Sequence, residues 1–326
     1  MTRLSTHYMG LKLSNPIIAA SSGLSKDING IMRLSDAGVG AIVLKSLFEE
    51  QIQSEVMSTY IQSFSDRTEA YDYLKGAISQ KNTETYLNLI SNAKKSTATP
   101  IIASLNCVTS GDWVKFARQI EDAGADGLEL NISVLPFDHE LSSEQNEKVY
   151  FEIIDSISSN LSIPIAIKMG GYSAGLANLI KRISWTRKVK AVVLFNRYYQ
   201  PNIDINTKTI ISTDIYSNPS DITLPIRWLG LLSNQFPLDF AGSTGIYSGA
   251  DVIKMLLVGA KTAQTASALY KHGAAHVGVM LAEITSWMDK NEYSTIADFR
   301  GILCQSNMGT KAYERVQFMK YYGGIE

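Results

Sequence analysis

DFAGSTGIYSGADVIKMLLVGAKTAQTASALY, residues 239–270, contains two apolar runs separated by a helical pattern. The first run ends in the small residues 242–245, and the second ends at 266–267. A helix is predicted over 248–258, because its first residue is a serine that suits an N-cap and Gly259 follows its last residue. Continuous hydrophobicity is typical of strands that are buried on both faces of a parallel sheet. The stretch therefore predicts a strand–helix–strand unit.

Six further apolar runs of this kind occur along the chain. The eight predicted strands end at Ser21, Lys45, Ser104, Asn131, Lys168, Asn196, Ser243 and Ser267. Most of the connecting segments show helical periodicity. Eight such units predict an α/β fold, a (β/α)8 TIM barrel with long insertions after strands 2 and 6. Because the active site of such a barrel lies where its strands end, these polar side chains are expected around one cavity.

The composition is that of an ordinary globular protein, with 45% hydrophobic residues in 326. Thirty basic and 31 acidic residues give a net charge of −1, which argues against nucleic acid or an anionic membrane as partner. The sequence shows no apolar stretch long enough for a membrane span and no signal peptide at its start. Two cysteines, Cys107 and Cys304, are too few for an iron–sulfur cluster. A cytoplasmic protein with one domain over residues 1–326 is expected.

Two connections are longer than a simple barrel needs. Residues 46–98 hold an acidic and aromatic segment followed by a helix expected over 83–95, and residues 197–224 are rich in Tyr, Asn, Asp and Thr and predict a long loop or hairpin. Loops of this length in a compact domain are usually lids or partner surfaces. Shorter helices are expected over 25–37 and 110–123. No role is predicted for the C-terminal tail, 302–326.

Small residues follow the last two predicted strands. Gly242, Ser243, Thr244 and Gly245 come after the seventh strand, and Ala266 and Ser267 come after the eighth. Small side chains at these two turns allow backbone N–H groups to approach a phosphate. The alternative is a tight turn that needs glycine only for its geometry. Because two successive strands share the pattern, phosphate binding is favoured.

Four strand-end residues suit recognition of an anionic or polar ring. Lys45 and Lys168 each follow a buried run, so they are expected either to face an anionic ligand or to form an ion pair with a glutamate inside the barrel mouth. Asn131 and Asn196 carry amides that donate and accept hydrogen bonds, as the edge of a flavin or a pyrimidine requires. Their alternative is a structural role.

His139 is a candidate for proton transfer, although a solvated loop histidine is the more common situation. His7, His272 and His276 show no metal-ligand spacing with a carboxylate or cysteine, so no metal site is predicted.

The segments GLKLSNPIIAASSG, GAIVLKS, DGLELNIS, PIAIKM, GSTGI and TASALY, with IADFRG near the end, resemble in this order the dihydroorotate dehydrogenase family, in particular its soluble class 1 branch. The resemblance runs from Leu11 to about Gly301. It implies flavin mononucleotide (FMN) over the carboxyl-terminal mouth of the barrel. It also implies oxidation of dihydroorotate to orotate, a step of pyrimidine biosynthesis, by hydride transfer to flavin N5.

The resemblance also implies roles for individual residues. Lys45 and Asn131 would be catalytic, and both would contact the substrate together with Asn196. Lys168 would lie at the pyrimidine edge of the flavin. The implied cofactor contacts are Ala20, Ser21, Gly23, Lys45, Ser46, Ser104, Asn131, Lys168, Phe195, Gly242, Ser243, Thr244, Gly245, Ala266 and Ser267.

The substrate half departs from the family pattern. Val134 stands where the family has a cysteine or serine base, and valine cannot take a proton. Ser133, His139 or water is the expected replacement. The family's asparagine-rich loop after the second strand has no counterpart, and two phosphate-turn glycines are replaced by Thr244 and Ala266. A base contributes about 10²–10⁴ in rate, so slow oxidation of dihydroorotate is expected.

Three alternatives to that activity remain open. One is a flavoprotein that oxidises a different reduced substrate, another is a non-catalytic FMN-binding partner protein, and the third is a barrel that binds some other phosphorylated ligand. If the enzyme is active, electrons are expected to pass to a soluble acceptor such as fumarate or to a separate reductase subunit. The resemblance implies a homodimer.

Overall fold

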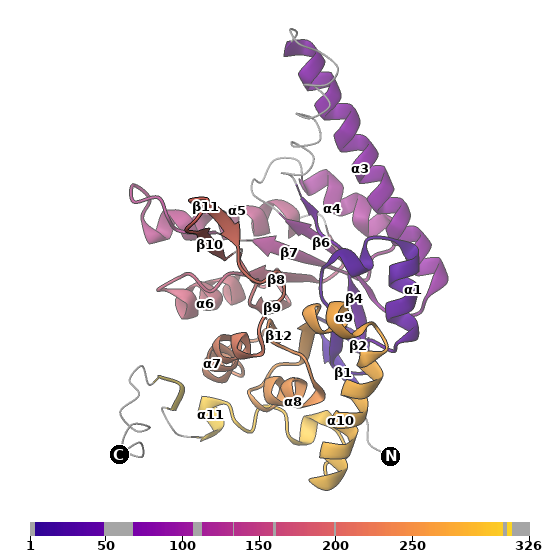
Figure 1. Cartoon of the computed structure of the whole chain (residues 1–326), viewed down its shortest axis with the longest axis vertical. Coiled ribbons are helices and arrows are strands. Elements are labelled where there is room, and N and C mark those ends of the chain that lie inside the picture. The colour runs from indigo at the N-terminus through magenta and orange to yellow at the C-terminus, as the bar shows by residue number, and fades with distance from the viewer. Residues whose placement is uncertain are drawn as a thin grey trace.

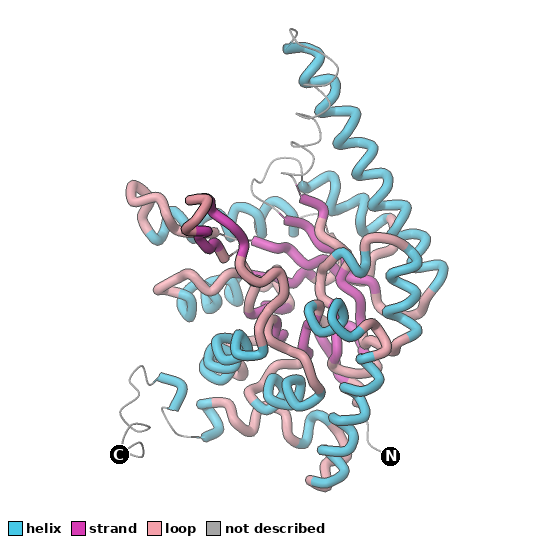
Figure 2. Tube along the Cα trace, viewed as in Figure 1, coloured by secondary structure: helices cyan, strands magenta, loops and turns pink. Residues whose placement is uncertain are grey.

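A closed barrel of eight parallel strands forms the centre of the protein, with helices around it (Figures 1 and 2). The computed structural model describes residues 4–48, 68–106, 113–132, 134–158, 161–198, 200–308 and 312–314, excluding the side chains of residues 48, 68–81 and 113–115. The barrel strands are β3 (Ile17–Ala19), β4 (Ala41–Val43), β6 (Ile101–Asn106), β7 (Gly127–Ile132), β8 (Ile165–Met169), β9 (Ala191–Leu194), β12 (Asp239–Ser243) and β13 (Thr262–Thr265). The predicted (β/α)8 barrel is confirmed.

Pairing between β4 and β6 closes the ring, with Ile42 opposite Ile101 and Val43 opposite Ile102. A short additional strand, β5 (Leu47–Phe48), pairs with the end of β6. Strand β6 extends to Asn106, so Ser104 lies within the strand rather than at its end.

The interior of the barrel and its outer surface are packed separately. Inside the ring, small and branched side chains such as Ala41, Val43, Ile102 and Ala166 form one cluster. A much larger cluster lies between the strands and the helices. Strands buried on both faces need apolar side chains on both, which explains the continuous apolar runs of the sequence.

The amino-terminal end of the barrel is closed by a hairpin of β1 (Thr6–Tyr8) and β2 (Leu11–Leu13). Tyr8 and Leu13 are fully buried in the interior cluster. The Met9 N–H donates to Asp239, the first residue of β12, at 2.8 Å. Buried side chains of the hairpin thus fill this end of the barrel.

The helices cover the outside of the ring. They are η1 (Gly23–Ser25), α1 (Ile28–Asp36), α3 (Thr68–Ser96), α4 (Trp113–Asp122), α5 (Ser143–Ser158), α6 (Leu176–Thr186), η2 (Pro219–Ile222), α7 (Thr223–Leu232), α8 (Gly249–Leu257), α9 (Ser267–His272), α10 (His276–Lys290), η3 (Ile296–Asp298), α11 (Gln305–Met308) and η4 (Ala312–Glu314). Asp27 caps α1 and Ser248 caps α8 through their side chains. Helix α3 begins well before the expected 83–95 and projects beyond the barrel (Figure 1).

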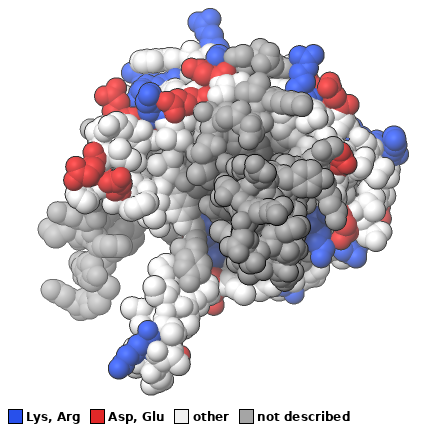
Figure 3. Space-filling view, turned by 90° about the horizontal axis from the view of Figure 1, so that it is seen from above, with Lys and Arg blue, Asp and Glu red and all other residues white. Residues whose placement is uncertain are grey.

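The connection over 197–224 contains a hairpin of β10 (Pro201–Asp204) and β11 (Thr209–Ser212), which stands out from the barrel in Figure 1. The chain then returns to the barrel through residues 213–218, here called the strap. Within the other long connection, 46–98, residues 49–67 lie outside the described part. On the face drawn in Figure 3, acidic and basic side chains of the described residues lie near one another.

Candidate active site

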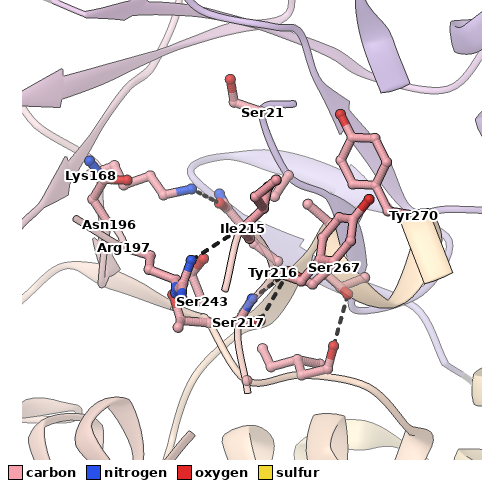
Figure 4. Close-up of a pocket in the computed structure, with 17 residues that line it drawn as sticks. Ser21, Lys168, Asn196, Arg197, Ile215, Tyr216, Ser217, Ser243, Ser267 and Tyr270 are labelled. Carbon is pink, nitrogen blue, oxygen red and sulfur yellow. Dashed lines mark hydrogen bonds between the residues drawn. The ribbon is translucent and has the colours of Figure 1, made fainter. Parts of the chain in front are cut away.

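A cavity of about 440 Å³ lies at the carboxyl ends of β3, β8, β9, β12 and β13 (Figure 4). This size is within the usual range for small-molecule sites. Its walls are formed by Ala20, Ser21, Lys168, Asn196, Arg197, Ile215, Tyr216, Ser217, Ser243, Thr244, Gly245, Ile246, Gln264, Thr265, Ala266, Ser267 and Tyr270.

The turn after β12 has a backbone that favours glycine. Gly245 has φ +75°, and a Cβ built on it would lie 2.3 Å from the backbone nitrogen of Ile222. Its neighbour Thr244 has φ +82°, and the Thr244 hydroxyl donates to the Phe195 carbonyl at 3.1 Å. The turn is thus packed against η2 on one side and hydrogen-bonded on the other to Phe195, the residue that follows β9.

Ser267, at the second small-residue turn, is held by the strap. The Ser217 N–H and the Ser217 hydroxyl both donate to Ser267 Oγ, each at 3.0 Å. Tyr247 donates its phenolic hydrogen to the Ser217 carbonyl. A serine hydroxyl has two acceptor lone pairs and one proton. With both lone pairs engaged, the Ser267 proton remains to donate to an anion.

Lys168 belongs to a buried polar group inside the barrel. Its Nζ donates to Gln264 Oε1 at 2.9 Å and lies 3.8 Å from Glu129 Oε1. Gln264 Nε2 donates to Glu129 Oε2 at 2.5 Å. The ion pair with a glutamate, which the sequence left as an alternative for Lys168, is therefore present, and Lys168 also lines the cavity.

Arg197 fastens the strap beside the cavity. Its guanidinium donates to the carbonyls of Asp214 at 2.8 Å and Ile215 at 3.1 Å, and Nε lies 3.6 Å from Asp221 Oδ2. Sequence reasoning missed Arg197 because it follows Asn196 directly, outside the strand end. It missed Gln264 as well, because the run AQTAS looked apolar.

Three serines form a row of hydroxyls at the rim of the barrel. Ser46 Oγ lies 2.9 Å from Ser21 Oγ and 2.7 Å from Ser104 Oγ. Tyr86 of α3 donates to the Ser104 carbonyl at 3.1 Å. Burial raises the pKa of Tyr86, against a smaller lowering by its hydrogen bond to the Ser104 backbone. The phenol is therefore a neutral hydrogen-bonding group that fixes Ser104 in place.

The structure brings together nine of the predicted site residues around the central cavity: Ala20, Ser21, Lys168, Asn196, Ser243, Thr244, Gly245, Ala266 and Ser267. Lys45 and Ser46 line a second cavity, of about 530 Å³, together with side chains of α3 such as Asn82 and Asn92. Asn131 pairs with Lys168 in the strand register.

Five predicted residues lie outside the lining of both cavities: Gly23, Ser104, Asn131, Phe195 and Gly242. Gly23 faces Tyr270, because its Cβ would lie 2.7 Å from the Tyr270 hydroxyl. Gly242 faces Met255 of α8. Phe195 is buried in the outer core.

Val134, at the family's base position by the sequence resemblance, and His139, a candidate replacement for the base, both lie outside the lining of the central cavity. Val134 borders a separate cavity of about 340 Å³ with Tyr150 and Met169. His139 has a side chain that is 91% exposed, with Nε2 at 3.1 Å from Glu140 Oε1. Ser133 lies outside the described residues.

The described residues include neither a membrane-spanning helix nor a group of metal ligands. No helix there is both long and apolar enough to span a membrane. Within the same residues, no three His, Cys, Asp or Glu side chains are grouped so that they could hold a metal ion.

Comparison with known proteins gives one family. The family model described as dihydroorotate dehydrogenase matches residues 3–288. The catalytic subunit of dihydroorotate dehydrogenase B (NAD(+)) from Thermoplasma volcanium is 25% identical, over 93% of this chain and 99% of its own. The chain is 24% identical to dihydroorotate dehydrogenase (fumarate) from Lachancea kluyveri, over 92% and 98%. It is 23% identical to the chloroplastic dihydropyrimidine dehydrogenase (NADP(+)) of Arabidopsis thaliana, over 91% and 76%.

Proposed function

The chain belongs to the dihydroorotate dehydrogenase family, oxidoreductases that act on a CH–CH bond, and from this premise we propose that it binds FMN in the central cavity and oxidises dihydroorotate or a related reduced ring. The observation that carries the proposal is that two turns of small residues and a buried lysine border the same cavity. The turns at Thr244–Gly245 and Ala266–Ser267 border it, and so does the Lys168 ammonium.

The lining residues fit a ligand with a phosphate and a polar ring. The side chains at the two turns are small, and Gly245 has no room for a Cβ. Lys168 supplies a positive charge at a buried point of the same cavity. Hydride acceptance at N5 is the chemistry that FMN supplies when bound.

The chain's own residues would bind and orient the reactants. The Ser267 hydroxyl and the backbone of Thr244 and Gly245 would hold the phosphate. Lys168 would stabilise negative charge at the pyrimidine edge of the flavin. Asn196 lines the cavity and would orient the substrate through its amide.

Proton removal needs a group other than residue 134, because valine has no acid–base function. Ser133, His139 or water remains the predicted replacement. Loss of turnover in Ser133→Ala or in His139→Ala would identify that residue as the base. Undiminished turnover in both variants would indicate that water takes the proton.

A second candidate is oxidation of a reduced ring compound other than dihydroorotate. Val134 favours it, because by the sequence resemblance a valine stands where the family has its base. Similarity to a protein named dihydropyrimidine dehydrogenase supports this second candidate as well. Turnover of such a compound, with dihydroorotate inert, would establish it.

The electron acceptor is proposed to be a small soluble molecule or a separate redox subunit. The names of two relatives support these alternatives, since one is a catalytic subunit of an NAD(+) enzyme and the other uses fumarate. The homodimer implied by the sequence resemblance stays a prediction, which sedimentation analysis of the purified chain tests directly.

The test of the proposed function is the visible spectrum of the purified protein, recorded before and after anaerobic addition of dihydroorotate. Flavin bands that bleach would support the family reaction. Bands that stay would reject dihydroorotate and favour the second candidate. A protein that takes up no FMN would overturn the proposal.

A further inference from the structure

Glu129, Lys168 and Gln264 come from three strands and meet inside the barrel. Glu129 lies on β7 and pairs with Ala166 of β8, so Lys168 is one layer nearer the carboxyl-terminal mouth. Gln264 lies on β13, which is separated from β8 by β9 and β12. The Lys168 side chain must therefore reach across the barrel to meet Gln264, and it borders the central cavity on the way (Figure 4).

The glutamine amide links the two charges in one orientation. Its oxygen accepts from the Lys168 ammonium, and its nitrogen donates to the Glu129 carboxylate. A flipped amide would direct its oxygen at the carboxylate and its NH2 group at the ammonium, and both contacts would be repulsive. Gln264 is therefore fixed, and it fixes the position of the ammonium.

Glu129 is buried inside the barrel, away from solvent. Only 1% of its side chain is exposed, and its Oε1 accepts no hydrogen bond from any described residue. That oxygen lies 3.8 Å from Lys168 Nζ, too far for a hydrogen bond but close enough for strong attraction at low dielectric. After burial, the next cause that raises the pKa of Tyr8, at the closed end of the barrel, is the charge of Glu129.

We propose that Glu129 and Gln264 are positioning residues, which hold the Lys168 ammonium at the floor of the cavity and set how much of its positive charge a bound flavin experiences. The inference rests on the proposed function, because it takes the ligand to be FMN. Reduced flavin carries negative charge at its pyrimidine edge, so it interacts with Lys168 more strongly than oxidised flavin does. Glu129 offsets part of that preference.

The test is the midpoint potential of FMN bound to wild-type protein and to Glu129→Gln. Loss of the carboxylate leaves the ammonium without its counter-charge. The variant is expected to bind reduced FMN about tenfold more tightly relative to oxidised FMN, a rise of ~30 mV for a two-electron couple. In Gln264→Leu the ammonium loses its acceptor, and the dissociation constant for oxidised FMN is expected to rise about tenfold.

A double-mutant cycle separates action through Lys168 from general disturbance of the barrel. In a Lys168→Met background, Glu129→Gln should no longer raise the potential. Thr262→Val is the matched control: Thr262 is fully buried on β13, two residues from Gln264, and its hydroxyl has no partner among the described residues. This variant should leave the potential and the FMN affinity unchanged.

A stability measurement without flavin tests the ion pair between Lys168 and Glu129 even if Lys168→Met folds poorly. An unpaired buried carboxylate is strongly destabilising, whereas removal of both charges is much less so. The melting temperature of the FMN-free protein should therefore fall in Lys168→Met and recover in Lys168→Met/Glu129→Gln.

The outcomes distinguish the inference from the proposed function. Wild-type protein that binds FMN, with the same potential in Glu129→Gln, would refute the inference alone. An equal rise in the Lys168→Met background would also refute it, because Glu129 would not act through Lys168. Wild-type protein that binds no FMN would refute the proposed function and the inference together.

Discussion

Ser217 donates two hydrogen bonds to the hydroxyl oxygen of Ser267, one from its backbone N–H and one from its side chain, each 3.0 Å long. Ser217→Ala removes the side-chain bond and leaves the Ser267 hydroxyl free to turn away from the cavity. One such bond is worth about 1 kcal/mol, so the dissociation constant for FMN is expected to rise about fivefold. Fluorescence titration of the FMN-free protein measures it.

Ser220→Ala serves as the control for that prediction, because Ser220 is an exposed residue of η2 on the same connection. FMN affinity should be unaffected in this variant. Equal weakening in both variants would show that the connection as a whole is sensitive, and that the Ser217–Ser267 contact has no specific effect.

Gly245 and Gly273 have nearly equal φ angles, +75° and +78°, in different surroundings. An alanine Cβ at position 245 would lie 2.3 Å from the Ile222 nitrogen, whereas a Cβ at 273 would meet no atom within 4 Å. Gly273→Ala should therefore cost only the strain of the backbone, which at φ +78° and ψ 166° is about 1–3 kcal/mol of unfolding free energy. Gly245→Ala should cost more than Gly273→Ala, because its methyl group also meets the backbone of η2, and it should weaken FMN binding. Denaturant unfolding of both variants measures the difference, and equal costs would mean that η2 yields to the new methyl group.

The barrel itself was predictable from the sequence, because a strand buried on both faces leaves a simple signal. Runs such as AIVLK and PIAIK are apolar at every position before the final lysine, and the structure has a strand in each of the eight runs. Helix caps were predictable for the same local reason, as Ser248 shows. The start of α3 was not, because its first half shows no clear apolar face in the sequence.

The lining of the site was only partly predictable. Strand-end residues such as Lys168 and Ser267 could be found because their position follows from the strand pattern. Arg197 and Ser217 reach the cavity through a connection whose path depends on long-range contacts, and no local pattern encodes that path. The position of Lys45, in the neighbouring cavity beside Ser46, likewise depends on how the chain turns after β4.

Asp251 supports the turn between β12 and α8, and its effect on stability should depend on pH. Its carboxylate accepts hydrogen bonds from the N–H groups of Tyr247 and Ser248, both at 3.1 Å, and from Lys254 at 2.9 Å. Burial alone would raise the pKa of Asp251, but these bonds outweigh it and hold the pKa below the ordinary value of 3.8. A depressed pKa in the folded state stabilises the protein above the unfolded value, and this contribution is lost as the pH falls through the folded pKa.

Asp251→Asn should therefore be less stable than wild type at pH 7, by about 1–2 kcal/mol. The difference should begin to shrink below about pH 4, because the carboxyl of the unfolded chain takes up its proton there, and it should continue to shrink as the pH falls through the lower pKa of the folded state. Unfolding free energies measured between pH 7 and pH 3 follow this directly. A difference that stays constant over the range would show that the charge of Asp251 is not what supports the turn.

The sequence resemblance implies that Val134 stands at the position of the family's base, and on this premise we predict that a thiol there restores proton removal. Val134→Cys is expected to oxidise dihydroorotate about 10²-fold faster than wild type, at the lower end of what a general base contributes. The gain should increase with pH, because the thiolate is the form that takes up a proton. Val134→Ala is the matched control, since it opens the same space without adding a base. If the alanine variant gains as much as the cysteine variant, bulk at residue 134 limits the reaction and the base lies elsewhere. A cysteine variant no faster than wild type would instead favour the second candidate substrate class.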